Sequence, residues 1–415
     1  MENLEKNSAY RDFRICAYRN KYEPALIFGG KTLSFGMLLS RAEYAYNTFC
    51  QMGIDPGDRV CLWLPNCPDL LASFYGLSRL GAIAVLIHPS DTPREVRRQM
   101  RSADAGLLIT TPGRYDDFCR EGEPLLPGQV VLCRPESDMK GPDRRVYLAA
   151  ERPEEEEVKG YLLEDLMAEN RYNALETPFG DKDQAAVVLS GTTGFIRPNF
   201  ILYLPEELTD TVAEFWRRRE PVHTVYVENS FATEGGFLAA HGALSTGRTL
   251  IWSVGEPYEL LKKRKPDLLI ATEEFFWEFR QRTEFFGKKW ENLQGGIQLG
   301  KELTPLMEKF AGRAIAAVGG MGGLCGSPVP LKVRREELYF VKDFGVRLAD
   351  MEQELSRLSG IAKCKCTADG GGIRLRVLPD GKEPVSTLGR ALVTCCKREM
   401  NPLHLPRSVE FCSVL

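Results

Sequence analysis

The sequence lacks the patterns that mark several large classes of protein. No apolar run reaches the roughly 20 residues needed to cross a bilayer, and the start of the chain is polar with no signal-peptide core. Lys plus Arg number 54 against 57 for Asp plus Glu, so the net charge of −3 provides no field that would gather nucleic acid. We therefore expect a cytoplasmic protein that handles a small molecule, with no nucleic acid partner and no membrane span.

The spacing of metal ligands is also missing. The 12 cysteines include no CxxC pair, and only 4 histidines are available as partners. Cys364 and Cys366 alternate in a strand-like stretch, while Cys395 and Cys396 are adjacent in an apolar helical stretch. We interpret these four as buried, reduced side chains, because no tetrahedral spacing motif supports a zinc site. No structural metal is expected.

What the sequence does contain is an alternation of strand-like and helix-like segments. In the first third, a strand at 59–64, a helix at 69–80 and a strand at 82–87 read as a βαβ unit. The pattern weakens between 114 and 173, where the acidic run 154–157 is interpreted as a solvated loop. Alternation then resumes, with strands expected at 187–189, 224–227, 249–252, 268–271 and 314–318 and helices at 206–219 and 235–245. The pattern predicts an α/β fold with mostly parallel pairing.

The sharpest change of composition is the glycine-rich stretch GGMGGLCG at 319–326, which is followed by the basic stretch 332–335. We place a domain boundary there. The prediction is a large α/β domain over 1–330, a linker over 331–340 and a small α+β domain over 341–415.

The most informative residues form the sequence SGTTG, directly after an apolar run; they are Ser190, Gly191, Thr192, Thr193 and Gly194. A strand that opens into glycines and hydroxyls presents backbone N–H groups and short donors, which can wrap a phosphate chain, and Arg197 could add a cationic contact. The spacings of a Walker loop and of a GxGxxG turn are absent. We expect a loop between strands here, although such a sequence is also common structural punctuation.

The surrounding sequence resembles the adenylate-forming superfamily of acyl-CoA synthetases, peptide-synthetase adenylation domains and luciferase-like enzymes. The resemblance is carried by KTLSFGMLLSRAEYAYNTFCQMGIDPGDRVCLWLPNCPDLLASFYGLSRLGAIAVLIHP at 31–89, by SGTTG, by KRKPDLLIATEEFFWEF at 263–279, by IQLGKEL at 297–303, by VKDFGVRLADMEQEL at 341–355 and by ALVTCCKREMNPLHLPRSVEF at 391–411.

The resemblance implies a large adenylate-forming N-terminal domain with a small α+β C-terminal domain, and a two-step reaction. A carboxylate attacks the α-phosphate of ATP with Mg²⁺, giving an acyl adenylate, and a thiol such as CoA then takes the acyl group. SGTTG corresponds to the phosphate loop of that family. Arg197 falls where the family usually has lysine, and Gly300 lies in the segment that leads to the adenine pocket.

The chain departs from the family pattern at several functional positions. The family's Thr-Glu pair, whose glutamate helps to hold Mg²⁺, is replaced by GGMGG at 319–323, and the ribose-binding aspartate has no counterpart. The sequence also stops at Leu415, before the loop that carries the family's adenylation lysine. Lys342 matches a position near the domain hinge, and we interpret it as a solvated surface lysine.

Two hypotheses follow. In the first, the chain is a catalytically impaired member, a pseudoenzyme that binds a ligand or a partner such as an acyl carrier protein or an active ligase. In the second, it is an active carboxylic acid:CoA ligase. Because the resemblance places the acyl pocket near Phe231, Phe237 and Gly320, these are candidates by position, and each could equally be core. His241 lies on a largely apolar helix and is expected to be a packed core histidine.

Overall fold

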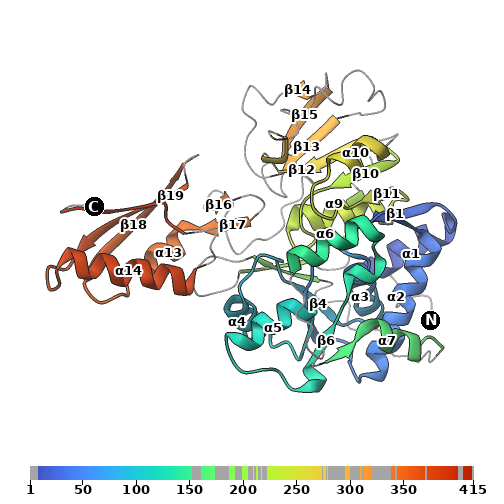
Figure 1. Cartoon of the computed structure of the whole chain (residues 1–415), viewed down its shortest axis with the longest axis horizontal. Helices are drawn as coiled ribbons and strands as arrows, with labels where there is room; N and C mark the ends of the chain where they lie inside the picture. The colour runs from blue at the N-terminus through green and yellow to red at the C-terminus, as the bar shows by residue number, and fades with distance from the viewer. Residues whose placement is uncertain are drawn as a thin grey trace.

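The computed structural model describes residues 8–151, 160–172, 187–191, 199–203, 209, 212–213, 216, 222–272, 274–276, 278, 295–299, 309–310, 313–318, 338–341, 344–369, 372–400 and 405–413. These residues form two large sheets with helices between them and on their outer faces, and a smaller C-terminal group of elements (Figure 1). The α/β fold predicted from the alternation is confirmed.

The first sheet has seven strands in the order β7-β6-β5-β3-β4-β8-β9. All neighbours are parallel except β8 and β9, which pair antiparallel at one edge. The strands are β3 (Arg59–Trp63), β4 (Ile83–Leu86), β5 (Leu107–Thr110), β6 (Val130–Leu132), β7 (Tyr161–Leu162), β8 (Val187–Gly191) and β9 (Asn199–Tyr203). The predicted βαβ unit is therefore present as β3, α3 (Pro68–Leu80) and β4, close to its expected bounds.

The second sheet has eight strands in the order β14-β15-β13-β12-β10-β11-β1-β2. Its interior is parallel, and an antiparallel pair closes each edge. The strands are β1 (Pro24–Phe28), β2 (Lys31–Ser34), β10 (Thr224–Val227), β11 (Thr249–Ile251), β12 (Leu268–Ala271), β13 (Gly295–Leu299), β14 (Lys309–Phe310) and β15 (Arg313–Val318). Two of its strands, β1 and β2, come from the start of the chain.

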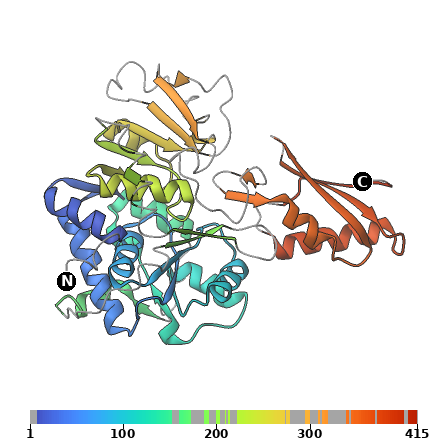
Figure 2. The same ribbon diagram turned by 180° about the vertical axis from the view of Figure 1, so that it is seen from behind.

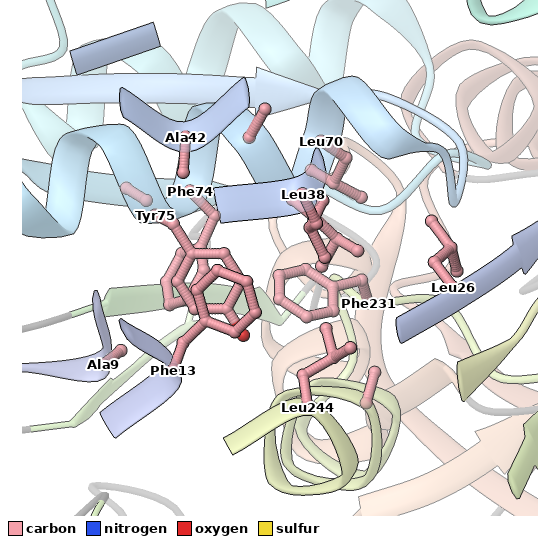
Figure 3. Packing of buried hydrophobic residues seen from close by; sticks show 14 of the residues in the cluster. Ala9, Phe13, Leu26, Leu38, Ala42, Leu70, Phe74, Tyr75, Phe231 and Leu244 are labelled. Atoms are coloured by element: carbon pink, nitrogen blue, oxygen red, sulfur yellow. The ribbon is translucent and has the colours of Figure 1, made fainter. Parts of the chain in front are cut away.

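Four helices fill the space between the two sheets, namely α1 (Ala9–Arg19), α2 (Phe35–Gln51), α3 and α9 (Glu234–Ser245). Alternate residues of the strands face this layer. In β3, Val60 and Leu62 belong to the central core, whereas Cys61 and Trp63 face the opposite side. Figure 3 shows the centre of the layer, where the rings of Phe13 and Tyr75 stack with their centroids 4.2 Å apart.

The outer faces of the sheets are covered by other helices. α4 (Pro93–Ala103) and α5 (Pro112–Arg120) pack on the first sheet, and α10 (Tyr258–Arg264) packs on the second. α6 (Gly141–Glu151) and α7 (Leu163–Glu169) complete this part of the chain. Figure 2 shows the same layers from behind. Between 114 and 173, where the sequence pattern weakens, the structure therefore still alternates helices with short strands.

The sequence explains why α2 and α3 can lie close together. Ser34 caps α2 by accepting a hydrogen bond from the backbone N–H of Met37 at 3.2 Å, as expected for a serine before an apolar stripe. Gly76 of α3 faces α2, and a Cβ at this position would lie 2.9 Å from the backbone nitrogen of Tyr46 and 3.2 Å from the carbonyl oxygen of Ala42. A side chain at Gly76 would therefore push the two helices apart.

The elements after residue 338 build a separate sheet and core. β16 (Leu338–Val341) and β17 (Phe344–Arg347) form a hairpin, and β18 (Ile361–Asp369), β19 (Gly372–Pro379) and β20 (Ser408–Phe411) form a three-stranded sheet covered by α13 (Leu348–Leu355) and α14 (Val385–Glu399). Cys364, Cys366, Cys395 and Cys396 lie in this core, as interpreted from the sequence. Residues 338–340, which the sequence assigned to the linker, lie in strand β16. The domain boundaries at 330 and 340 stay a prediction.

Candidate ligand-binding site

A pocket of about 510 Å³ opens where the two large sheets meet. Its walls come from the segments that directly follow parallel strands: Pro65 and Asn66 after β3, His88 and Pro89 after β4, Glu228 to Ser230 after β10, Ser253 to Gly255 after β11 and Thr272 after β12. Open parallel sheets bind their ligands at the carboxyl ends of the strands, so this is the expected place for a site.

Glu228 is fixed in the wall of the pocket by its neighbour on β12. Its backbone N–H donates to the carbonyl of Ile270 at 2.9 Å, which extends the pairing of β10 with β12 beyond the last strand residue. Its carboxylate oxygen Oε2 accepts two hydrogen bonds from Thr272, one from the backbone N–H and one from the hydroxyl, both at 2.8 Å. The negative charge is thereby held at a defined position.

Asn66 joins the two sheets at the floor of the pocket. Its side-chain Nδ2 donates to the backbone carbonyl of Asn229 at 3.0 Å, and its Oδ1 accepts from the backbone N–H of Phe231 at 2.8 Å. Both contacts reach from the end of β3 in the first sheet to the segment after β10 in the second. The amide therefore fixes the position of the backbone that presents Asn229 to the pocket.

The side chain of Asn229 itself is in an unusual state. The residue lines the pocket, yet it is only 2% exposed, and neither Oδ1 nor Nδ2 has a hydrogen-bond partner. A buried amide that makes no hydrogen bond costs about 1–3 kcal/mol of stability. Unpaired buried groups of this kind are exceptional in folded proteins, which makes the segment after β10 a candidate for a functional role.

His88 forms the opposite wall, at the end of β4. Its Nδ1 lies 3.1 Å from the backbone N–H of Ser90 and accepts from it, which places the ring proton of a neutral imidazole on Nε2. Behind this wall Gln99 donates to Asp91 at 2.6 Å. Burial, and next the charge of Glu95, raise the pKa of Asp91 well above its usual value.

The rim of the pocket is acidic. Glu274 and Glu278 are exposed there, and the hydroxyl of Tyr258 donates to Oε2 of Glu278 at 2.9 Å. Together with Glu228 they supply three carboxylates, whereas the lining that the structure describes contains neither lysine nor arginine.

The predicted phosphate loop lies only partly in the described chain. Ser190 and Gly191 are the last two residues of β8, paired with Phe200 and Asn199 of β9, so the expected loop over 190–194 is wrong at its first two positions. β8 runs parallel to β4 with Leu189 opposite Leu86. The carboxyl end of β8 therefore lies at the same end of the sheet as His88, which follows β4. Five further predicted positions lie outside the described residues, namely Thr192, Thr193, Gly194, Arg197 and Gly300.

The candidates for the acyl pocket belong to the core. Phe231 and Phe237 are fully buried, and both rings pack edge-on against Phe74 (Figure 3 shows Phe231 and Phe74). His241 lies beside them with its Nδ1 3.1 Å from the hydroxyl of Tyr75, and burial lowers its pKa to about 3. The expectation of a packed histidine is confirmed. Gly320, the segment 319–323 and Lys342 lie outside the described residues.

Sequence reasoning missed the residues that line the pocket. A signal was present, since the expected strand 224–227 is followed directly by the polar residues Glu228, Asn229 and Ser230. Polar residues directly after a buried parallel strand are candidates for a site by the carboxyl-end rule. For the part of the chain that the structure describes, no three His, Cys, Asp or Glu side chains are grouped to hold a metal ion, and no helix has the length and apolar character to cross a bilayer.

Comparison with known proteins assigns the chain to a family. Residues 13–336 match the family described as AMP-binding enzyme. A 3-hydroxybenzoate–CoA ligase of Aromatoleum sp. (strain CIB) is 23% identical to this chain over 342 residues, which cover 74% of the chain and 60% of the ligase. The match thus spans less than two thirds of that curated relative.

Solved structures of similar shape come from the same group of enzymes. A benzoate CoA ligase from Burkholderia xenovorans LB400 aligns with a TM-score of 0.63 at 14% identity, covering 99% of this chain and 96% of its own. An o-succinylbenzoate CoA synthetase from Bacillus subtilis aligns with a TM-score of 0.71 at 12% identity, covering 97% and 95%. At such identities the comparison establishes a common fold.

Proposed function

The chain belongs to the family of AMP-binding enzymes, and from this premise we propose that it binds a small carboxylate in the pocket between its two sheets while its adenylating activity is impaired. The observation that carries the proposal is the pocket itself, built at the carboxyl ends of parallel strands with the unpaired amide of Asn229 in its lining. The names of the relatives, among them ligases of benzoate and 3-hydroxybenzoate, support a carboxylate as the ligand.

The impaired activity is argued from the sequence. Transfer of an adenylyl group develops negative charge on the phosphates, which fixed cations must stabilise. In the segment 319–323 this chain has GGMGG where the resemblance expects a threonine and the glutamate that helps to hold Mg²⁺, and the ribose-binding aspartate has no counterpart.

The second candidate function is an active carboxylic acid:CoA ligase that uses ATP with Mg²⁺ and CoA. The retained SGTTG sequence favours it, because Ser190 and Gly191 end β8 at the sheet edge that carries His88. Under this reading Ser190 to Gly194 and Arg197 bind the phosphates, and Gly300 lies beside the adenine. A protein partner, such as an acyl carrier protein or an active ligase, and a cytoplasmic location belong to the proposal as well.

Two measurements on the same preparation distinguish the two functions. The first is calorimetric titration with small aromatic and aliphatic carboxylates, in which saturable binding is expected. The second is pyrophosphate release with the same acids, ATP, Mg²⁺ and CoA, where we expect turnover far below the ordinary enzyme rate of about 1 per second. Turnover at that ordinary rate would establish the active ligase instead.

A further inference from the structure

We propose that Asp91 is a positioning residue for one wall of the pocket, and that it acts as a neutral carboxylic acid that keeps its proton near neutral pH. The residue lies behind the wall, three positions after His88, which lines the pocket. The proposal rests on the proposed function, because it takes this pocket to be the binding site. It follows from the hydrogen bonds, the burial and the charged neighbours of Asp91.

The turn between β4 and α4 is held together by Asp91 and the pocket residues before it. The backbone N–H of Asp91 donates to the carbonyl of His88 at 3.0 Å, and the backbone N–H of Ser90 donates to Nδ1 of the same histidine at 3.1 Å. The next pocket residue, Pro89, is held from α5, because its carbonyl accepts from the guanidinium of Arg114. The position of His88 therefore depends on where Asp91 is fixed.

The carboxyl group of Asp91 fixes this turn to α4. Its Oδ2 accepts a hydrogen bond from Nε2 of Gln99 at 2.6 Å. Gln99 lies in the second turn of α4 and is only 1% exposed, so the contact is made inside the protein. A side chain without an acceptor at position 91 would leave the amide of Gln99 without this partner and would release the turn from the helix.

Asp91 lies where a negative charge is disfavoured. The residue is 3% exposed, and its Oδ1 has no hydrogen-bond partner in the part of the chain that the structure describes. Glu95, in the first turn of α4, is also buried, and its Oε2 accepts from the N–H and the hydroxyl of Thr92 at 2.8 and 3.0 Å. These two hydrogen bonds stabilise the charged form of Glu95, so a second negative charge on Asp91 would be repelled.

The charged and polar neighbours of Asp91 act in both directions, and burial decides. Burial, and next the charge of Glu95, raise the pKa of Asp91 well above its usual value, while the hydrogen bonds from Gln99 and from the backbone of His88 and the charge of Arg114 oppose this. The protonated carboxyl keeps the acceptor that Gln99 needs and avoids the repulsion from Glu95. The ionised form meets only the first of these two requirements.

The protonation of Asp91 is tested by urea unfolding of the full chain at several pH values. Asp91→Asn keeps an acceptor for Gln99 and cannot ionise. In the wild type the unfolded chain loses this proton near the ordinary pKa of about 3.9 and the folded chain retains it, so the wild type loses stability relative to the variant as the pH rises. Between about pH 5 and pH 6 the ratio of the two unfolding constants should change about tenfold. His241 is present in both proteins, so its titration cancels in this ratio.

The matched control is Asp104→Asn at the end of the same helix, where the side chain is 96% exposed. The ratio of its unfolding constant to that of the wild type should be the same at both pH values. A ratio for Asp91→Asn that also stays constant would show that Asp91 is ionised in the folded protein, and the proposal would be wrong.

The positioning role is tested by hydrogen exchange at neutral pH, measured on peptides that cover residues 88–92. Asp91→Asn should retain the wild-type protection of these amides. Asp91→Leu is of similar size but accepts no hydrogen bond, so it should lower the protection at least about tenfold, the effect of one hydrogen bond. Gln99→Leu removes the same hydrogen bond from the side of α4 and takes the place of Asp91→Leu if that variant does not fold. Wild-type protection in the leucine variant would overturn the proposal.

Calorimetric titration with benzoate separates this proposal from the proposed function. Benzoate should bind to the wild type and to Asp91→Asn with equal affinity, and to Asp91→Leu at least about tenfold more weakly. If benzoate and the other carboxylates do not bind to the wild type, the proposed function is overturned, and hydrogen exchange still decides the role of Asp91. If Asp91→Leu binds benzoate as tightly as the wild type, Asp91 does not position the wall and the proposal is wrong.

Discussion

The unpaired amide of Asn229 predicts that stability and ligand binding are opposed at this residue. Asn229→Leu replaces an amide that makes no hydrogen bond with an apolar side chain of similar size, and it leaves intact the backbone carbonyl that accepts from Asn66. The free energy of unfolding should therefore rise by about 1 kcal/mol, while binding in the pocket that Asn229 lines weakens. Urea unfolding and calorimetric titration measure the two effects.

The matched control is the neighbouring asparagine. Asn66→Leu removes an amide that is bonded at both ends, so the same substitution should lower the free energy of unfolding by about 2 kcal/mol. A comparable loss of stability in both variants would show that Asn229 is paired in the folded protein, and the argument for its role would fall.

His241 predicts a dependence of stability on pH. Burial lowers its pKa to about 3, against about 6.5 in the unfolded chain, so the unfolded state binds a proton that the folded state excludes between these values. The contribution to stability is complete above pH 6.5 and is lost progressively as the pH falls. Between pH 7.5 and 5.5 the loss should be about 1.4 kcal/mol.

Two variants isolate this contribution. Tyr75→Phe removes the hydroxyl beside His241 and keeps the buried imidazole, so it should retain the acid sensitivity. The double variant Tyr75→Phe, His241→Phe lacks the imidazole. Between pH 7.5 and 5.5 its free energy of unfolding, measured with urea, should fall by about 1.4 kcal/mol less than that of the single variant. Equal losses in the two proteins would assign the acid sensitivity to other groups.

At the scale of elements, two helical glycines predict opposite effects of the same substitution. Gly76→Ala in α3 places a Cβ 2.9 Å from the backbone of α2, so the free energy of unfolding should fall by about 1–3 kcal/mol. In Gly389→Ala of α14 the new Cβ lies 3.5 Å from the ring of Phe411, which is an ordinary contact. The free energy of unfolding should therefore rise by up to about 1 kcal/mol, because alanine has the higher helix propensity. Thermal or urea unfolding of both variants gives the sign, and a stabilising Gly76→Ala would contradict the close packing of α2 on α3.

The sequence predicts elements where apolar residues repeat and fails where they do not. β10 and β12 match their expected bounds, because buried parallel strands are continuous apolar runs. α6 begins at a Gly-Pro pair and is largely exposed, and β7 has two residues, so neither leaves a clear periodic signal. The pocket is harder still, since its lining comes from several strand ends that only the tertiary fold brings together.

At the scale of the whole molecule, the separate core after residue 338 predicts separate unfolding. Trp63, Trp216 and Trp252 are buried in the part of the chain before residue 300, and no tryptophan follows that residue, so tryptophan fluorescence reports this part. The buried thiols of Cys364 and Cys366 report the C-terminal sheet. Unfolding in urea can be followed by tryptophan fluorescence and by chemical labelling of these thiols, with the labelled peptides detected by mass spectrometry. The two unfolding transitions should have different urea midpoints. Coincident midpoints would show one cooperative unit.

The place of β1 in the second sheet has a consequence for synthesis of the chain. Its neighbour β11 follows much later in the sequence, and the Thr249 hydroxyl that donates to the carbonyl of Pro24 at 2.7 Å spans 225 residues. At typical translation rates the ribosome needs on the order of ten seconds or more to deliver this partner. During that time β1 can pair only with β2, so one edge of this hairpin and its apolar residues stay exposed on the nascent chain, where they can aggregate, until β11 emerges.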